Sequence, residues 1–235
     1  MDVVYIVGVQ NSHEELRYSL RSLANLEHGR VWIAGHLPAW VRNVGHIATL
    51  QTGTVWQNST NNLLAACSHP EVSDRFIFMN DDYFILQPTE IGVFHRGPII
   101  DRYPRCGQTV KGQRKYDGME GTYNLCREAG VETPLDYELH VPLPVVKQGM
   151  AEAVSHARRA DLNVDRLRKR SLYGNLNAIG GNRIKDVTSR DRGSTWEDGQ
   201  LFVSTSNVSF ADWPVGDRLR ELFPEPSIYE KRMAA

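Results

Sequence analysis

The alternation of short apolar runs with amphipathic stretches over the first 95 residues constrains the fold most. Val3–Val7 is apolar, rich in β-branched residues and followed by Gly8, which predicts a buried strand. Runs at 31–34, 47–50 and 75–79 predict three further strands. Helices that alternate with buried strands cover both faces of a sheet, so the pattern predicts an α/β fold with a mostly parallel sheet.

Two helices are expected between these strands. Ser12, with Glu15 three residues later, fits a capping box, and residues 16–23 carry leucines on one face. Asn58 or Ser59 is expected to cap the second helix, whose apolar residues follow directly.

The second part of the chain is rich in helix breakers. Glycines and prolines recur through 96–140, which predicts loops over one face of the sheet and one short helix at Thr122–Ala129. The elements expected next are a strand at Tyr137–Val141, helices at Lys147–Arg159 and Asp165–Ile179, a strand at Leu201–Thr205 and a helix at Val215–Leu222. Without a clear linker or repeat, residues 1–235 are predicted to form a single domain.

Composition excludes several classes of protein. The 235 residues include 27 basic and 28 acidic side chains, so no overall positive field draws the chain to nucleic acid or to an anionic membrane. No apolar run approaches the ~20 residues of a membrane span, and no basic leader precedes the first strand. The three cysteines lack CxxC spacing, so structural zinc and a disulfide framework are not expected, and the cytoplasm is the predicted location.

The strongest candidate site is Asn80-Asp81-Asp82, which follows an apolar strand. Ligands of open α/β sheets bind at the carboxyl ends of strands. Two carboxylates there can hold a divalent cation that also contacts the phosphates of a nucleotide. Asn and Asp also favour turns, so an ordinary polar turn is the alternative interpretation.

A second candidate is the end of the first strand, with Val7, Gly8 and Gln10 as possible donor-binding residues. Backbone N–H groups before a helix can meet a nucleotide. The alternative is an ordinary strand-to-helix turn, because the segment lacks GxGxxG and a Walker lysine.

A third candidate joins His140 to a basic stretch. Histidine ligates metals and arginine makes two-pronged phosphate contacts. A solvated helix face is the alternative interpretation. The basic residues are Arg158, Arg159, Arg166, Arg168, Lys169 and Arg170.

Several segments resemble, in order, the Stealth family of sugar-phosphate transferases. This family includes bacterial capsular polysaccharide phosphotransferases and the eukaryotic lysosomal-enzyme N-acetylglucosamine-1-phosphotransferase. The matching segments are ELRYSLRSL at 15–23, VWIAGHLPAW at 31–40, RFIFMNDDY at 75–83, LHVP at 139–142, an arginine at Arg170 and LRELFPEPSIYE at 219–230.

The resemblance implies a core like that of GT-A glycosyltransferases, which is Rossmann-like. It implies that residues 1–95 bind a nucleotide sugar, with UDP or GDP as the nucleotide, and that 96–235 form the acceptor side and closing helices. It implies Mn²⁺ or Mg²⁺ held by Asp81, Asp82 and His140, with Asp82, His140 and Arg170 as catalytic residues. The remaining donor-side candidates are Arg17, Asn58, Ser59 and Asn80.

Differences from the family pattern favour glycosyl transfer over sugar-phosphate transfer. The opening segment lacks the family's acids, and the family's central glutamate falls near Leu63 or Asn62. Sugar-1-phosphate transfer stays the first alternative, and an inactive nucleotide-sugar-binding module is the second.

The acceptor side offers a base and a basic segment. A transferase that inverts the sugar's configuration needs a general base near the acceptor hydroxyl. Asp136 is the first candidate, ahead of Asp117, Glu120 and Glu138. The segment Arg96–Gly121 is expected to close over the ligand as a lid. With its basic and tyrosine residues it suits a saccharide or protein acceptor, with DNA carrying a modified base as another possibility. Those residues are Arg96, Arg102, Arg105, Lys111, Arg114, Lys115, Tyr103 and Tyr116.

Overall fold

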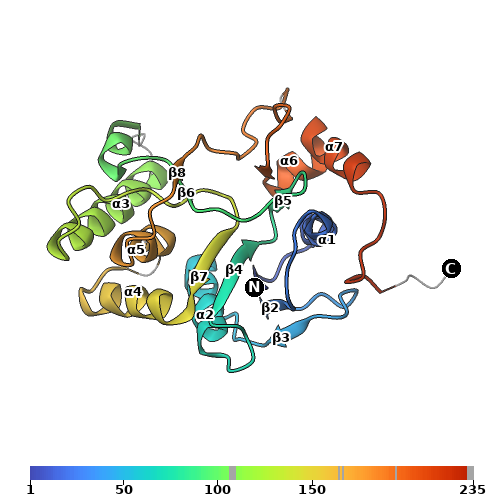
Figure 1. Ribbon diagram of the computed structural model, residues 1–235. Helices are drawn as coiled ribbons and strands as arrows, with labels where there is room; N and C mark the ends of the chain where they lie inside the picture. The colour runs from blue at the N-terminus through green and yellow to red at the C-terminus, as the bar shows by residue number, and fades with distance from the viewer. Residues whose placement is uncertain (106–109, 164, 166, 194, 232–235) are drawn as a thin grey trace.

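A five-stranded sheet lies at the centre of the computed structural model, which describes residues 1–105, 110–163, 165, 167–193 and 195–231 (Figure 1). Its spatial order is β3-β2-β1-β4-β7, with the first four strands parallel and β7 antiparallel at one edge. The strands are β1 (Asp2–Val7), β2 (Val31–Gly35), β3 (Gly45–Ile47), β4 (Arg75–Asn80) and β7 (Leu143–Val146). The α/β, mostly parallel fold is thereby confirmed.

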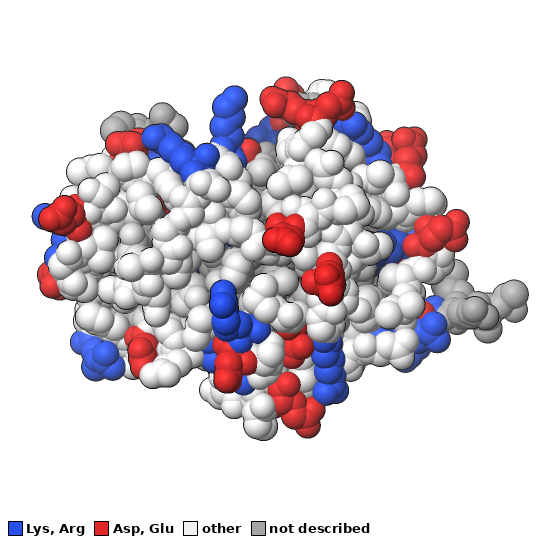
Figure 2. Space-filling view, viewed as in Figure 1, with Lys and Arg blue, Asp and Glu red and all other residues white. Residues whose placement is uncertain are grey.

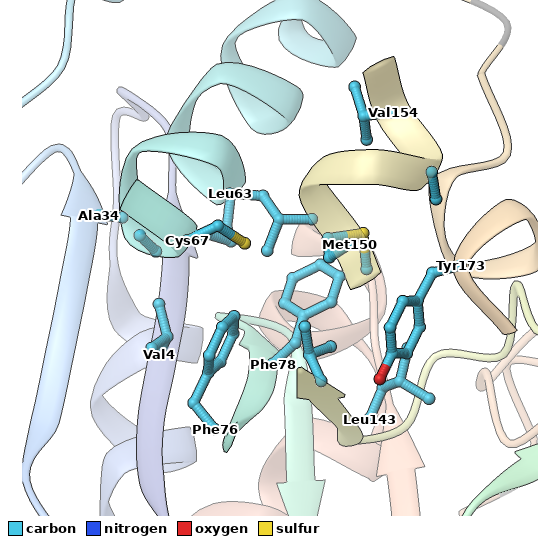
Figure 3. Packing of buried hydrophobic residues seen from close by; sticks show 14 of the residues in the cluster. Val4, Ala34, Leu63, Cys67, Phe76, Phe78, Leu143, Met150, Val154 and Tyr173 are labelled. Atoms are coloured by element: carbon cyan, nitrogen blue, oxygen red, sulfur yellow. The ribbon is translucent and has the colours of Figure 1, made fainter. Parts of the chain in front are cut away.

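Both faces of the sheet are covered because the central strands are apolar on both sides. Along β1, Val4 and Ile6 belong to one hydrophobic cluster while Val3, Tyr5 and Val7 belong to another. The first cluster includes residues of α2 (Val55–Ser68), α4 (Lys147–Arg159) and α5 (Lys169–Leu176). The second cluster includes the leucines of α1 (Glu14–Ser22). Figure 3 shows the first cluster, where side chains of α2 and α4 meet the phenylalanines of β4.

Six helices accompany the strands on these faces and near the chain's end. They are α1 (Glu14–Ser22), α2 (Val55–Ser68), α4 (Lys147–Arg159), α5 (Lys169–Leu176), α6 (Asn207–Asp212) and α7 (Pro214–Leu222). A short 3₁₀ helix, Leu23–Asn25, follows α1. The bounds of α4 agree with the prediction, whereas α6 was not expected.

The predicted caps of the first two helices are wrong. The N-cap of α1 is His13, and Ser12 Oγ only accepts the N–H of Glu14 at 3.3 Å. Helix α2 begins before Asn58, because Thr54 and Gln57 form a reciprocal capping box.

The expectation of loops in 96–140 is wrong for much of that segment, whereas the lid expected at Arg96–Gly121 stays a prediction, with 106–109 outside the described residues. Ile99–Arg105 is a 3₁₀ helix, and α3 (Val110–Glu128) is long. A glycine inside a helix costs about 1 kcal/mol relative to alanine, and tertiary packing overrides that preference here. Gly121 faces the side chain of Leu162, which would lie only 3.0 Å from an added Cβ.

The predicted strand at Tyr137–Val141 lies in irregular structure. Its alternate residues are buried, but the Tyr137 N–H donates to Ser171 Oγ at 3.0 Å instead of to a neighbouring strand. The edge position beside β4 is taken by β7. Helix α5 is shorter than predicted, and it begins where Glu138 Oε1 accepts the N–H groups of Arg170 and Ser171.

Two small sheets complete the fold. Strand β5 (Tyr83–Ile85) pairs antiparallel with β9 (Phe202–Ser204), and β6 (Phe94–His95) pairs with β8 (Asn182–Arg183). The first pairing places Phe202–Ser204, which is distant in sequence, beside Tyr83–Ile85, which follows β4. Among the described helices, none is both long and apolar enough to cross a membrane.

Candidate active site

The acids predicted after β4 lie beside the end of β1. In the sheet register Ile6 of β1 pairs with Asn80, the last residue of β4. Gln10, in the loop that leaves β1, donates from Nε2 to Asp81 Oδ2 at 2.6 Å. Asn207 Nδ2 in turn donates to Gln10 Oε1 at 3.2 Å. The structure therefore joins two of the predicted segments through one glutamine side chain.

His140 lies beside the second acid. Its Nδ1 is 3.5 Å from Asp82 Oδ2 and 3.2 Å from Ser204 Oγ. The imidazole packs at an angle on the Tyr83 ring, and 41% of its side chain is exposed. Asp82 and His140, distant in sequence, thus form the cluster that the sequence predicted.

Asp81 and Asp82 place two acidic groups side by side with little positive charge around them. Burial, and then repulsion from Asp82, raise the pKa of Asp81 to about 7. Within the described part of the chain no lysine or arginine forms an ion pair with Asp81 or Asp82. A bound cation would relieve this repulsion.

Glu15, which sequence reasoning did not place in the site, is buried beside it. Only 8% of it is exposed, and its Oε1 accepts the hydroxyl proton of Thr205, whose N–H donates to Asp82 O at 3.2 Å. Burial first, with repulsion from Asp82 and Asp81, raises the pKa of Glu15 to about 8. The sequence signal was present in ELRYSLRSL, but the glutamate was interpreted as part of a helix cap.

The donor set suits a hard divalent cation. Asp81, Asp82 and His140 supply carboxylate oxygens and an imidazole nitrogen, which Mn²⁺ accepts. Among the residues that the structure describes, no three His, Cys, Asp or Glu side chains form a ready-made metal cluster. A metal ion held by these residues therefore stays a prediction.

Arg170 lies under the site. It is 4% exposed, Nη1 donates to Tyr83 OH at 3.0 Å and Nη2 donates to the Val141 carbonyl. Asn80 Nδ2 also donates to Tyr83 OH at 3.0 Å. Arg170 therefore holds together the residues around the acids, and a direct contact with phosphate stays a prediction.

Asp136, Glu138 and Asp117, three of the predicted bases, make structural contacts. Asp136 Oδ2 is 2.9 Å from Arg102 Nε, and its Oδ1 accepts the N–H of Glu138 at 2.9 Å. Glu138 receives the first N–H groups of α5, as described above. On α3, Asp117 Oδ1 accepts from Gln113 Nε2 at 2.7 Å, and Glu120 is exposed.

Three donor-side candidates have local structural partners. Arg17 Nη1 is 3.5 Å from Glu230 Oε2, and its guanidinium stacks on the Trp40 ring. Asn58 exchanges two hydrogen bonds with the backbone of Gly53. Ser59 Oγ accepts from Lys169 Nζ at 3.0 Å. Their roles toward a donor stay predictions.

The basic residues predicted to bind phosphate or an acceptor are only partly described. Arg166 lies outside the described residues, as do the side chains of Tyr103, Arg105, Lys111 and Arg114. Arg96 is paired with Asp186 at 2.8 Å. On the face that Figure 2 shows, acidic and basic side chains are intermixed.

Two surface hollows lie away from the acids. One of about 370 Å³ is lined by Trp196, Arg218 and their neighbours, and one of about 460 Å³ by Leu26, His28 and theirs. Since neither is lined by Asp81, Asp82 or His140, the candidate site rests on its side-chain chemistry and its place at the sheet edge.

Comparison with solved structures finds galactosyltransferases. One is the galactosyltransferase LgtC in complex with donor and acceptor sugar analogues, at 12% identity and a TM-score of 0.53, covering 97% of this chain and 96% of that one. The chain shares its fold with this structure. An active-site mutant of LgtC matches similarly, at 11% identity and a TM-score of 0.52 over 94% and 95% of the two chains.

Sequence comparison adds no assignment to this fold. No protein-family model and no curated protein matches the chain. The resemblance to the Stealth family therefore stays a prediction based on short segments. Two of these segments are in contact, because Arg21 of ELRYSLRSL bonds both carboxylate oxygens of Glu230 in LRELFPEPSIYE.

Proposed function

We propose that the chain is a metal-dependent glycosyltransferase that moves a sugar from a nucleotide-sugar donor to a hydroxyl acceptor. The observation that carries the proposal is the contact of His140 with Asp82, next to Asp81 and directly after the carboxyl end of β4. The glycosyltransferase fold of the chain supports it. An otherwise unbalanced pair of acids is a reason for a cation to bind there.

In this proposal Asp81, Asp82 and His140 hold Mn²⁺ or Mg²⁺. A cation held there would neutralise charge that develops on the donor's diphosphate. Gln10 orients Asp81 through its 2.6 Å hydrogen bond. Arg170 fixes Tyr83, whose ring supports His140.

In glycosyl transfer the acceptor oxygen bonds to the anomeric carbon. The bond from that carbon to the diphosphate breaks, and the nucleoside diphosphate leaves with the electron pair while the acceptor proton passes to a base. Asp136 stays the predicted base, and its ion pair with Arg102 must open before it accepts a proton.

Sugar-1-phosphate transfer is the alternative. The acceptor would then attack phosphorus, and a nucleoside monophosphate would leave. Asn62, where the Stealth resemblance expects a glutamate, is a buried amide that donates to Val7 O at 3.3 Å and accepts from Thr49 and Gln51. An amide cannot exchange a proton as a glutamate does, which supports glycosyl transfer.

The experiment is a donor-hydrolysis screen. Purified protein is incubated with UDP- and GDP-sugars, with Mn²⁺ or with excess chelator, and the released nucleotides are separated by chromatography. Nucleoside diphosphate released only with the metal is expected. Monophosphate would establish the alternative reaction, and donor binding without any release would indicate an inactive nucleotide-sugar-binding module.

A further inference from the structure

The first turns of helix α2 lie at the carboxyl edge of the sheet. The helix connects β3 to β4, which run in the same direction, so it begins at that edge and runs back across the sheet. Leu63 shares a hydrophobic cluster with Ile6, near the end of β1. Asn62 Nδ2 donates to Val7 O at 3.3 Å. Ser59, one turn earlier in α2, therefore lies still nearer to the edge.

An open space adjoins the end of β1 on the face that α2 covers. Val4 and Ile6 point to this face, and the same alternation places Gly8 on it. A Cβ added to Gly8 would have no atom of the described residues within 4 Å, its chain neighbours aside. A ligand can therefore approach the backbone of Gly8 from the side of the sheet on which Ser59 lies.

Lys169 brings a positive charge to Ser59. It is the first residue of α5, it is half-buried, and its Nζ donates to Ser59 Oγ at 3.0 Å. Among the described residues, no carboxylate forms an ion pair with this ammonium. Burial, with repulsion from Arg170 and Arg168, outweighs the attraction of Glu138 and lowers the pKa of Lys169. An anion beside Lys169 would favour its charged form.

Other members of the same basic stretch are engaged elsewhere. Arg170 is 4% exposed and is bonded to Tyr83 and Val141. Arg158 and Arg159 lie at the end of α4, where they bond side chains of α2 and α4. Lys169, by contrast, extends its ammonium to the edge of the sheet where ligands of such folds bind.

We propose that Lys169 binds a phosphate group of the nucleotide-sugar donor in the space beside Gly8. The identity of the donor rests on the proposed function. A lysine ammonium binds phosphate as a point charge and has three N–H groups, of which Ser59 uses one. Asp81 follows the strand that pairs with β1, so the space and the acids lie at the same edge of the sheet.

The first measurement detects the contact in metal-free wild-type protein. Lysine side chains are labelled with carbon-13 at Cε, and inorganic pyrophosphate, UDP, GDP or uridine is added with chelator. The NMR signal of Lys169, assigned with Lys169→Arg, is expected to shift with the three phosphate compounds but not with uridine. The signal of Lys185, which is exposed between β8 and β9, is expected to stay in place. An unmoved Lys169 signal, or an equal shift with uridine, would overturn the inference without relying on the fold of a variant.

The second measurement compares variants by calorimetric titration with pyrophosphate. Lys169→Met is expected to weaken binding about 10–100-fold, as the loss of a charged hydrogen bond does. Lys169→Arg keeps the charge and should lose less, and Lys185→Met is the matched control. The Tm of Lys169→Met is expected not to fall, because the cost of burying a charge is removed with one hydrogen bond. A lysine that only ties α5 to α2 would give the opposite result, a lower Tm with unchanged affinity.

Two outcomes separate this inference from the proposed function. If nucleotide is released from a donor with metal while Lys169→Met keeps the wild-type affinity for pyrophosphate and UDP, the inference fails and the proposed function stands. If Lys169 contacts pyrophosphate but no donor releases nucleotide, the phosphate contact stands and the proposed function fails.

Discussion

The contact between α1 and the last described segment gives the sharpest stability prediction. Arg21 donates from Nε and Nη2 to the two carboxylate oxygens of Glu230, at 2.8 and 2.9 Å. Its Nη1 donates to the carbonyls of Phe223 and Pro224, both at 2.9 Å. The two side chains are only 9% and 4% exposed. Replacing Arg21 by leucine removes the pair and leaves Glu230 buried.

The expected loss of stability is about 3 kcal/mol. Removing one partner of a buried ion pair costs about 3–5 kcal/mol, because a charge stays buried without its counter-ion. The lower end applies because Glu230 keeps the Ser227 N–H at 2.8 Å and Arg17 at 3.5 Å. In a domain of this size that loss corresponds to a fall in Tm of about 6–12 °C.

The pH dependence of the loss tests its electrostatic origin. Burial favours a higher pKa for Glu230, but the hydrogen bonds of Arg21 and the Ser227 N–H outweigh burial and lower the pKa below its ordinary value. A carboxyl with a lowered folded pKa stabilises the protein at neutral pH, and that contribution is lost as the pH falls. The difference in unfolding free energy between the wild type and Arg21→Leu should therefore become smaller below a pH of about 4.

Urea unfolding at pH 7 and pH 3 measures both effects, with Glu71→Gln as the control. Glu71 pairs with Arg30 at 2.9 Å on the surface, where both side chains are more than half exposed. Such a pair contributes less than about 1 kcal/mol. If Arg21→Leu costs no more than this control, or if its cost does not depend on pH, the reasoning is refuted.

Three further predictions concern the site. Asp82→Asn should lower metal-dependent nucleotide release at least about 100-fold. Asp74→Asn, at the exposed opposite end of β4, is the control and should leave the release unchanged. If both variants lose nucleotide release equally, Asp82 does not belong to the site. Burial raises the pKa of Glu15 to about 8, so its contribution to stability falls as the pH rises from about 4.5 to about 8. In urea unfolding, Glu15→Gln should be as stable as the wild type at pH 5 and more stable than it at pH 8. Stability curves that run parallel across this pH range would contradict this. Arg170→Lys loses the fork that bonds Tyr83 and Val141, so it should destabilise the fold by about 1.5–3 kcal/mol, and an unchanged Tm would contradict the buried role.

Local patterns were sufficient for strands β1, β2 and β4 of the sheet, but not for β7. Strand β1 and helix α4 lie where apolar runs and helical periodicity placed them, because these signals depend on neighbouring residues alone. Asp81 and Asp82 could be predicted for the same reason, as acids that follow a buried strand at the ligand-binding edge of a sheet.

Contacts between distant segments decided what local patterns could not. Helix α3 tolerates its glycines because Gly121 packs against Leu162. The segment 137–141, expected to be a strand, is irregular, and β7 pairs with β4 at the edge of the sheet. A local preference of about 1 kcal/mol is smaller than the energy of such packing, so the fold overrides it.

The sequence by itself determined a mostly parallel sheet with two acids after one of its strands, and the family resemblance predicted a histidine beside those acids. Only the tertiary structure decided the surroundings of that site, since Glu15, Thr205 and Ser204 reach it from α1 and β9. A hydroxyl between a carboxylate and an imidazole has no signature in sequence spacing, because its partners are brought together by the pairing of β5 with β9. The chemistry of the acids is local, whereas the proton positions and charges that control it depend on the whole fold.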